Sequence, residues 1–211
     1  MPDRRPAVWL DHVVVGADDL DAGVSAFEEL TGVRPVYGGA HPTMGTHNAL
    51  VALGSGRYLE ILAPRPGASL HPLVRDVGES DTLTPCLWAL ATDDLIALHR
   101  VVSDAGCSAD EPSPGSRVTN EGETLRWSMF TMGHESPANA PFFIQWEPGT
   151  QHPSVSSPRG CSLGAFTVAS VDHEKLQLLL TAVGFSTSVV AGSTRTVIVL
   201  ATPRGTATLG G

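Results

Sequence analysis

One pattern of residues occurs three times along this chain and limits the folds open to it. Each copy has an apolar strand, an acidic or serine-containing cap, an amphipathic helix and a glycine that ends the helix. The copies are LDHVVVGADDLDAGVSAFEELTGV (10–33), PCLWALATDDLIALHRVVSDAGC (85–107) and SLGAFTVASVDHEKLQLLLTAVGF (162–185). In the first copy, Leu20, Val24 and Phe27 recur at helical spacing. The repeat predicts a chain built from related strand and helix units.

Strand-like runs, and not another helix, follow each of the first two helices. These runs are residues 33–37, 47–53 and 57–62 in the first copy, and 116–119, 124–131 and 142–147 in the second. Gly54-Ser55-Gly56 supplies a tight hairpin between two of the runs. The sequence therefore predicts two βαβββ modules, at residues 8–64 and 84–148.

The rest of the chain divides into seams and a third unit. Pro- and Gly-rich stretches at 63–72 and 147–160 separate the units. Residues 161–205 predict a partial βαβ(β) module, with a strand, a helix and one or two strands at 186–190 and 195–201, before the chain runs out at TPRGTATLGG. The expected fold class is α+β. Because 211 residues suit one ordinary domain, the modules are expected to share one.

Charge and cysteine content argue against several classes of protein. With 13 Lys and Arg against 22 Asp and Glu, a net charge of −9 disfavours a nucleic-acid or anionic-membrane surface. No apolar run reaches the length of about 18 residues that a membrane span needs, and the N-terminus lacks the features of a secretory signal. Cys86, Cys107 and Cys161 are widely spaced without a CxxC pair, which is typical of reduced thiols. We therefore expect a soluble, cytoplasmic protein with a small-molecule partner, and a homodimer stays open.

The order and spacing of several motifs resemble a known superfamily. LDHVVV opens the first module, GGAHPTMGTHNALVALGSGRYLEIL closes it, ATDDL joins strand to helix in the second and PFFIQW ends it. Over residues 8–148 this combination is similar to the glyoxalase-like domain family of the vicinal-oxygen-chelate superfamily, which includes glyoxalases, bleomycin-resistance proteins and extradiol dioxygenases. The resemblance implies a curved, eight-stranded mixed sheet around a central cleft for a divalent metal and a substrate.

In that superfamily the first and last strands of a module each supply one metal ligand, which corresponds here to His12 and Glu60. Imidazole and carboxylate suit iron, manganese, zinc or nickel. A carboxylate in an otherwise apolar strand needs a partner, which favours a role for Glu60 in catalysis as well as in metal binding. The alternatives are a solvated strand face for Glu60 and a backbone hydrogen bond for His12.

The second module departs from the pattern of the superfamily. Alignment of the helix caps and terminal glycines places Cys86 or Leu87 where a histidine is expected. The end strand offers Ile144 or Gln145 in place of a glutamate, and Glu147 shares a strand face with Gln145. A four-ligand site is therefore not visible, and a protein without any metal is a second expectation.

Two registers of the hairpin around Gly54 decide which side chain neighbours Glu60. With a two-residue turn, Glu60 pairs with Val51, and His47 lies on the same face about 13 Å away at ~3.4 Å per residue. With a turn one residue longer, Glu60 pairs with Leu50, His47 faces the other way and Asn48 becomes the diagonal neighbour.

Further polar and aromatic side chains are candidates for contact with a substrate. These candidates are His41, Asn48, Arg126, Gln145 and Trp146. His41 lies in a Gly-rich approach to the hairpin, at the rim of the cleft or as a ligand. Arg126, like Arg117, can meet an anionic substrate or lie exposed on its strand. The remaining histidines are expected at the solvated surface, namely His71, His99, His134, His152 and His173.

Two classes of function fit these observations. The first is a metal-dependent isomerase, lyase or dioxygenase whose ion polarises an oxygenated organic substrate. The second is a metal-free protein that sequesters a small molecule in the same cleft, as resistance proteins of the superfamily do. The histidine and glutamate of the first module favour the enzyme, and the missing histidine of the second favours the binding protein.

Overall fold

The computed structural model describes residues 5–72, 74, 77, 83–119 and 122–210. The first repeat forms β1 (Val8–Gly16), α1 (Leu20–Thr31), β2 (Val36–His41), β3 (Thr46–Gly54) and β4 (Arg57–Pro64). The second forms β5 (Thr84–Thr92), α2 (Leu95–Asp104), β6 (Ser113–Val118), β7 (Thr124–Phe130) and β8 (Phe142–Trp146). Both repeats have the predicted βαβββ order, which confirms the expected fold class.

Acidic residues between strand and helix cap the helices of both modules, and in the second module the cap is Asp94 and not the neighbouring Asp93. The carboxylate of Asp19 accepts a hydrogen bond from the amide of Ala22 at 2.8 Å, and Asp94 does the same for Ala97 at 2.9 Å. Gly32 ends α1 with a φ of 79°, a left-handed conformation that favours glycine. The two helices are therefore placed by equivalent local signals in the two modules.

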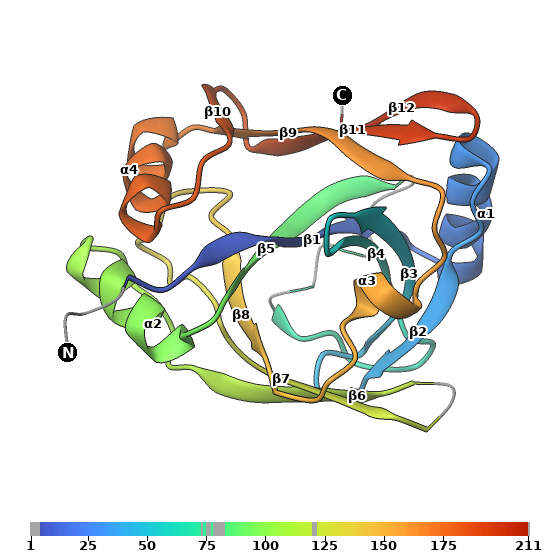
Figure 1. Cartoon of the computed structure of the whole chain (residues 1–211), viewed down its shortest axis with the longest axis horizontal. Helices are drawn as coiled ribbons and strands as arrows, with labels where there is room; N and C mark the ends of the chain where they lie inside the picture. The colour runs from blue at the N-terminus through green and yellow to red at the C-terminus, as the bar shows by residue number, and fades with distance from the viewer. Residues whose placement is uncertain (1–4, 73, 75–76, 78–82, 120–121, 211) are drawn as a thin grey trace.

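Eight strands form one curved mixed sheet in the order β2-β3-β4-β1-β5-β8-β7-β6 (Figure 1). The pairs β1/β4 and β5/β8 are parallel, and the other neighbours are antiparallel. The edge strands β2 and β6 approach each other, and the guanidinium of Arg117 on β6 donates to the carbonyl oxygen of Gly38 on β2. A side chain at Gly39 would meet the carbonyl oxygen of Val118 at 2.8 Å. The sheet is therefore nearly closed, with a concave inner face and a convex outer face.

The third repeat forms a smaller, separate sheet. Its elements are β9 (Ser162–Ser170), α4 (His173–Val183), β10 (Ser188–Ala191), β11 (Arg195–Thr202) and β12 (Gly205–Leu209), with strand order β10-β9-β11-β12. The expectation that the chain runs out after β11 is wrong, because TPRGTATLGG turns back as β12. In that strand Ala207 and Leu209 are buried while their neighbours are more exposed. The strand has only five residues, so this alternation is a weak signal in the sequence.

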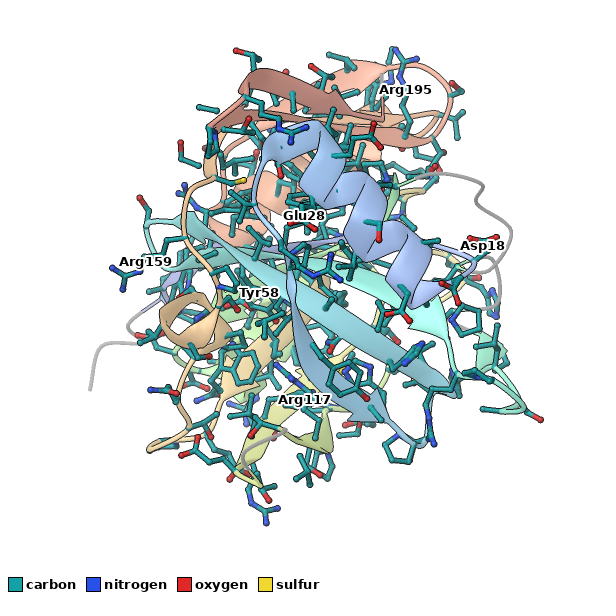
Figure 2. All side chains as sticks on the ribbon, turned by 90° about the vertical axis from the view of Figure 1, so that its right-hand side faces the viewer. Asp18, Glu28, Tyr58, Arg117, Arg159 and Arg195 are labelled. Atoms are coloured by element: carbon teal, nitrogen blue, oxygen red, sulfur yellow. The ribbon has the colours of Figure 1, made fainter. Side chains whose placement is uncertain are left out.

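The third repeat covers the convex face of the large sheet. One hydrophobic cluster joins Val13 of β1, Phe27 of α1, Leu98 of α2, Leu179 of α4 and Ile198 of β11, all of which are buried. Figure 2 shows α1 lying between the strands of the first module and the C-terminal sheet. The convex face is thus filled by apolar packing, which leaves the concave face for polar chemistry. Within the described residues, no helix is long and apolar enough to cross a membrane.

Candidate functional site

Both modules line a cavity of about 360 Å³ on the concave face. The first module contributes polar groups, namely His12, His41, Asn48 and Glu60. The second contributes a group of aromatic and apolar side chains, chiefly Leu87, Trp127, Phe142 and Trp146, together with the buried Arg117 and the exposed carboxylates of Asp110 and Glu111. The cavity therefore has a polar half and a largely apolar half, as small-molecule sites often do.

His12 and Glu60 lie side by side in the polar half. The parallel pairing of β1 with β4 sets Val14 beside Glu60 and His12 beside Tyr58, so the histidine and the glutamate lie on one face. Nε2 of His12 is 3.6 Å from Oε2 of Glu60, and the two residues are only 3% and 7% exposed. Their expected proximity is confirmed. The ring of Tyr58 stacks on that of His12 at a centroid distance of 4.5 Å.

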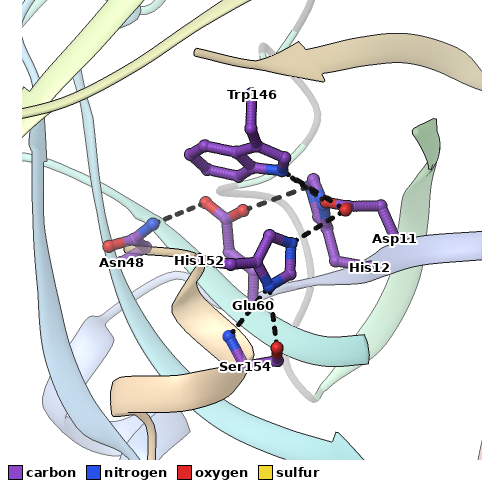
Figure 3. A network of polar contacts seen from close by, with 7 residues as sticks. All are labelled: Asp11, His12, Asn48, Glu60, Trp146, His152 and Ser154. Carbon is purple, nitrogen blue, oxygen red and sulfur yellow. Dashed lines mark hydrogen bonds and ion pairs between the residues drawn. The ribbon is translucent and has the colours of Figure 1, made fainter. Parts of the chain in front are cut away.

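Asp11 holds the far side of the His12 ring. Its carboxylate is fully buried and contacts Nδ1 of His12 at 2.7 Å, Nε2 of His152 at 2.9 Å and Nε1 of Trp146 at 3.3 Å (Figure 3). The register of β1 against β5 shifts between Leu10 and His12, so Asp11 departs from regular alternation. Burial raises the pKa of Asp11, but the hydrogen bonds and charges of His12 and His152 lower it overall to about 2.

The ionised Asp11 fixes which ring nitrogens carry protons. A carboxylate only accepts, so Nδ1 of His12 donates to it, and Nε2 is the atom presented to Glu60. Nδ1 of His152 accepts from the amide of Ser154 at 3.3 Å, so its Nε2 donates to Asp11. At 3.6 Å, Nε2 of His12 and Oε2 of Glu60 are too far apart for a direct hydrogen bond. Two acceptors that face each other in this way favour a proton or a cation between them.

The hairpin adopts the register with the longer turn. Leu50 pairs with Glu60, which makes Asn48 the diagonal neighbour of the glutamate. The side-chain nitrogen Nδ2 of Asn48 donates to Oε1 of Glu60 at 2.8 Å. His47 faces away from the cavity and lies against the ring of Tyr37. The other carboxylate oxygen of Glu60 therefore remains directed at His12.

The second module presents hydrocarbon where the first presents ligands. β1 and β5 pair Val14 with Leu87, and His12 with Ala89, which makes Leu87 the counterpart of the histidine about the pseudo-twofold axis. By the same symmetry, Ala89 is the counterpart of Val14. Val14 pairs with Glu60 and Ala89 pairs with Phe142, so Phe142 is the counterpart of the glutamate. Within the described residues, no group of three or more His, Cys, Asp or Glu side chains is placed to hold a metal ion. Among the described residues, an ion bound by His12 and Glu60 would thus have both of these protein ligands in the first module.

Two of the predicted substrate contacts lie outside the cavity. Gln145 was expected in the cleft, but its amide oxygen accepts from the amide of Leu95 at 2.8 Å and its nitrogen donates to the carbonyl of Asp93, at the start of α2. The alternation of β8 turns it away from Trp146, which does line the cavity. Arg126 is exposed and does not line the cavity, because it alternates along β7 with Trp127, which does.

His41 does line the cavity, where its Nδ1 lies 3.2 Å from the hydroxyl of Thr46. Burial lowers the pKa of His41, the charge of Glu60 opposes this shift, and the charge of Arg117 adds to it. The histidine is therefore mostly neutral near pH 7 and offers a hydrogen-bonding group without a charge.

Three residues around His12 were not predicted as part of the site. Asp11, Tyr58 and His152 contact its ring or each other. The expectation that His152 lies at the solvated surface is wrong, because α3 (Pro153–Ser156) holds it against Asp11. The Asp-His pair in LDHVVV was the one available signal for Asp11, since a buried histidine is often oriented by a carboxylate.

The paired βαβββ modules, their curved sheet and the cavity on its concave face define a protein of the vicinal-oxygen-chelate class. The sequence matches the family described as glyoxalase-like domain over residues 10–184, and the chain belongs to this family. No curated protein matches the chain.

Several solved structures are similar to this chain at low sequence identity. A hypothetical protein from Staphylococcus aureus is similar with a TM-score of 0.69 and 17% identity, over 97% of this chain and 86% of that one. Methylmalonyl-CoA epimerase from Mycobacterium tuberculosis gives a TM-score of 0.45 and 20% identity, over 66% of this chain and 87% of the epimerase. The epimerase from Streptomyces coelicolor in complex with 2-nitronate-propionyl-CoA gives 0.43 and 17%, over 64% and 95%. The Staphylococcus aureus structure supports the fold, and none of these likenesses carries a function.

Proposed function

We propose that this protein is an enzyme that acts on a small oxygenated organic substrate, with His12 and Glu60 as the working pair. The observation that carries the proposal is the 3.6 Å approach of His12 Nε2 to Glu60 Oε2 inside the cavity. Burying two ionisable groups is costly unless they are paired, so the placement of both in one cavity indicates a functional role for the pair.

The chain's own atoms suit proton transfer beside a carbonyl group, which is the step of an isomerase or a lyase. Glu60, held by Asn48 through Oε1, can take a proton with its other oxygen. His12, fixed from behind by Asp11, can accept a hydrogen bond from a substrate hydroxyl through Nε2. The aromatic and apolar half excludes water and accepts the carbon skeleton of the substrate.

The spacing of His12 and Glu60 also suits a divalent ion, which would have protein ligands on one side only. Two ligands that bind one ion at about 2.0–2.2 Å lie roughly 3–4 Å apart, which agrees with the separation of Nε2 and Oε2. A carboxylate behind the histidine is also the usual support of a metal-binding imidazole. His12 and Glu60 would hold iron, manganese, zinc or nickel, and the ion would supply Lewis acidity to a substrate oxygen.

The second candidate is a metal-free protein that binds a small molecule. It is favoured by Leu87 and Phe142, which give the second module no ligand at the positions that mirror His12 and Glu60. In this case Glu60 is satisfied by its hydrogen bond from Asn48, and the cavity serves binding alone.

Metal titration separates the two candidates. Protein purified without an affinity tag or chelator is titrated calorimetrically with Zn²⁺, Mn²⁺ and Ni²⁺. We expect one site for at least one of these ions, abolished in His12→Ala and weakened at least about tenfold in Glu60→Gln, because a neutral amide replaces a charged ligand. His47→Ala is the matched control, since this histidine faces away from the cavity. Binding that is unchanged in both site variants, or absent from the wild type, contradicts a metal-dependent enzyme.

A further inference from the structure

Arg117 is a buried cation for which the described part of the chain provides no carboxylate partner. Its residue surface is only 5% exposed, although it belongs to the edge strand β6. Among the ion pairs of the described residues, none involves Arg117. Its one hydrogen bond within the part of the chain that the structure describes goes to the carbonyl oxygen of Gly38. A guanidinium has five N–H donors, so most of its capacity is not used by that bond.

A buried charge without a counter-charge is costly, and something must offset that cost. The contact with Gly38 helps to join β2 to β6, but a neutral side chain can make the same contact without bringing a charge inside. Arg117 lines the same cavity as His12 and Glu60. A ligand in this cavity can therefore supply the missing negative charge.

We infer that Arg117 binds the carboxylate of a substrate whose oxygenated carbon lies at His12 and Glu60, an inference that rests on the proposed function. The planar fork of a guanidinium matches the two oxygens of a carboxylate. Glu60 lies inside the cavity, and Asp110 and Glu111 line it from exposed positions, so a dianion such as phosphate meets more repulsion than a monoanion. The substrate class is thus a small monocarboxylate with a nearby carbonyl or hydroxyl group.

The flanking groups agree with a ligand of this class. His41 lines the cavity in range of both Arg117 and Glu60, and its burial lowers its pKa and so favours the neutral ring. Trp127 and Trp146 line the cavity with their rings 5.5 Å apart, which gives an aromatic wall for the carbon skeleton. A hydroxy or oxo acid with an apolar substituent fills such a site.

Calorimetric binding of phenyllactate and of its neutral amide tests the inference without any need for turnover. We expect the wild type to prefer the acid over the amide by at least about tenfold, the scale of a charge-assisted bidentate contact. Arg117→Met is expected to lose this preference. Arg126→Met is the matched control, because it removes an exposed arginine from the neighbouring strand and should retain the preference.

Two further measurements keep the inference separate from the proposed function and from folding. Glu60→Gln should keep or increase the preference for the acid, even if it abolishes metal binding or turnover, since it removes a repelling charge. If Arg117→Met does not fold, Arg117→Lys decides, because it keeps the charge but loses the fork, and the preference should fall at least about threefold. The inference is overturned if a folded Arg117 variant prefers the acid as strongly as the wild type does, or if the wild type binds no phenyllactate. It is also overturned if inorganic phosphate displaces phenyllactate at a lower concentration than lactate does.

Discussion

Asp11 is the residue on which the geometry of the site depends most directly. It orients His12 from β1, Trp146 from β8 and His152 from the seam after the second module. Because it is fully buried, its negative charge depends on these three donors, which are its side-chain partners among the described residues. The same contacts that aim the imidazole at Glu60 therefore also stabilise the fold.

This dual role predicts a specific dependence of stability on pH. The pKa of Asp11 is lowered to about 2 in the folded state from an ordinary 3.8, so its contribution is present above pH 3.8 and is lost as the pH falls toward 2. At about 1.4 kcal/mol per pH unit, we expect this residue to account for about 2 kcal/mol of the free energy of unfolding. The free energy of unfolding, measured with urea, falls as the pH is lowered from 5 to 2, and we call this fall the acid limb. The acid limb should be less steep in Asp11→Asn than in the wild type.

The exposed carboxylate of Glu135 provides the control for this measurement. Glu135→Gln should leave the slope of the acid limb as it is in the wild type, because its charge is solvated in both states. An acid limb of equal slope in Asp11→Asn and the wild type would mean that Asp11 is not held as an anion by the two histidines.

At the scale of elements, the third repeat acts as part of the core of the large sheet. Trp88 of β5 packs against Phe166 of β9 and Phe185 after α4, with ring centroids 5.2 and 6.1 Å apart. Without these contacts the convex face would expose apolar side chains of the strands to water. The repeat is therefore expected to unfold together with the two modules.

Neighbouring leucines of α4 test this expectation. Leu179 is 1% exposed and Leu178 is 71% exposed. Leu179→Ala should lower the free energy of unfolding by about 2–5 kcal/mol through the lost burial and the cavity left behind, whereas Leu178→Ala should change it by less than about 0.5 kcal/mol. Urea unfolding followed by tryptophan fluorescence should show one transition in both variants. An early, separate transition in Leu179→Ala would show that the third repeat unfolds on its own.

The sequence predicted those features that local signals determine. Helix caps, glycines and alternating strands predicted the order of elements in both modules. The hairpin allowed two registers for the strand of Glu60, and one of the two is observed. Contacts between distant segments were not predictable. His152 reaches Asp11 across 141 positions of the chain, and its local sequence resembles that of a surface turn. The roles assigned to His12 and Glu60 remain predictions.

At the scale of the whole molecule, two modules of one topology have become chemically different halves. The first supplies the histidine and carboxylate, and the second supplies Leu87 and Phe142 at the mirrored positions. An ion in the cavity would have protein ligands on one side and open coordination positions toward the other. This asymmetry leaves room for two oxygen atoms of a substrate beside the apolar half.

Anomalous diffraction from crystals soaked in Mn²⁺ or Zn²⁺ tests the central claim that His12 and Glu60 work as a pair. We predict one peak on the concave face, within about 2.0–2.3 Å of both Nε2 of His12 and Oε2 of Glu60, with waters at the remaining positions. A peak bound elsewhere in the cavity, or an empty pair of side chains in crystals that hold the ion at other sites, would contradict it.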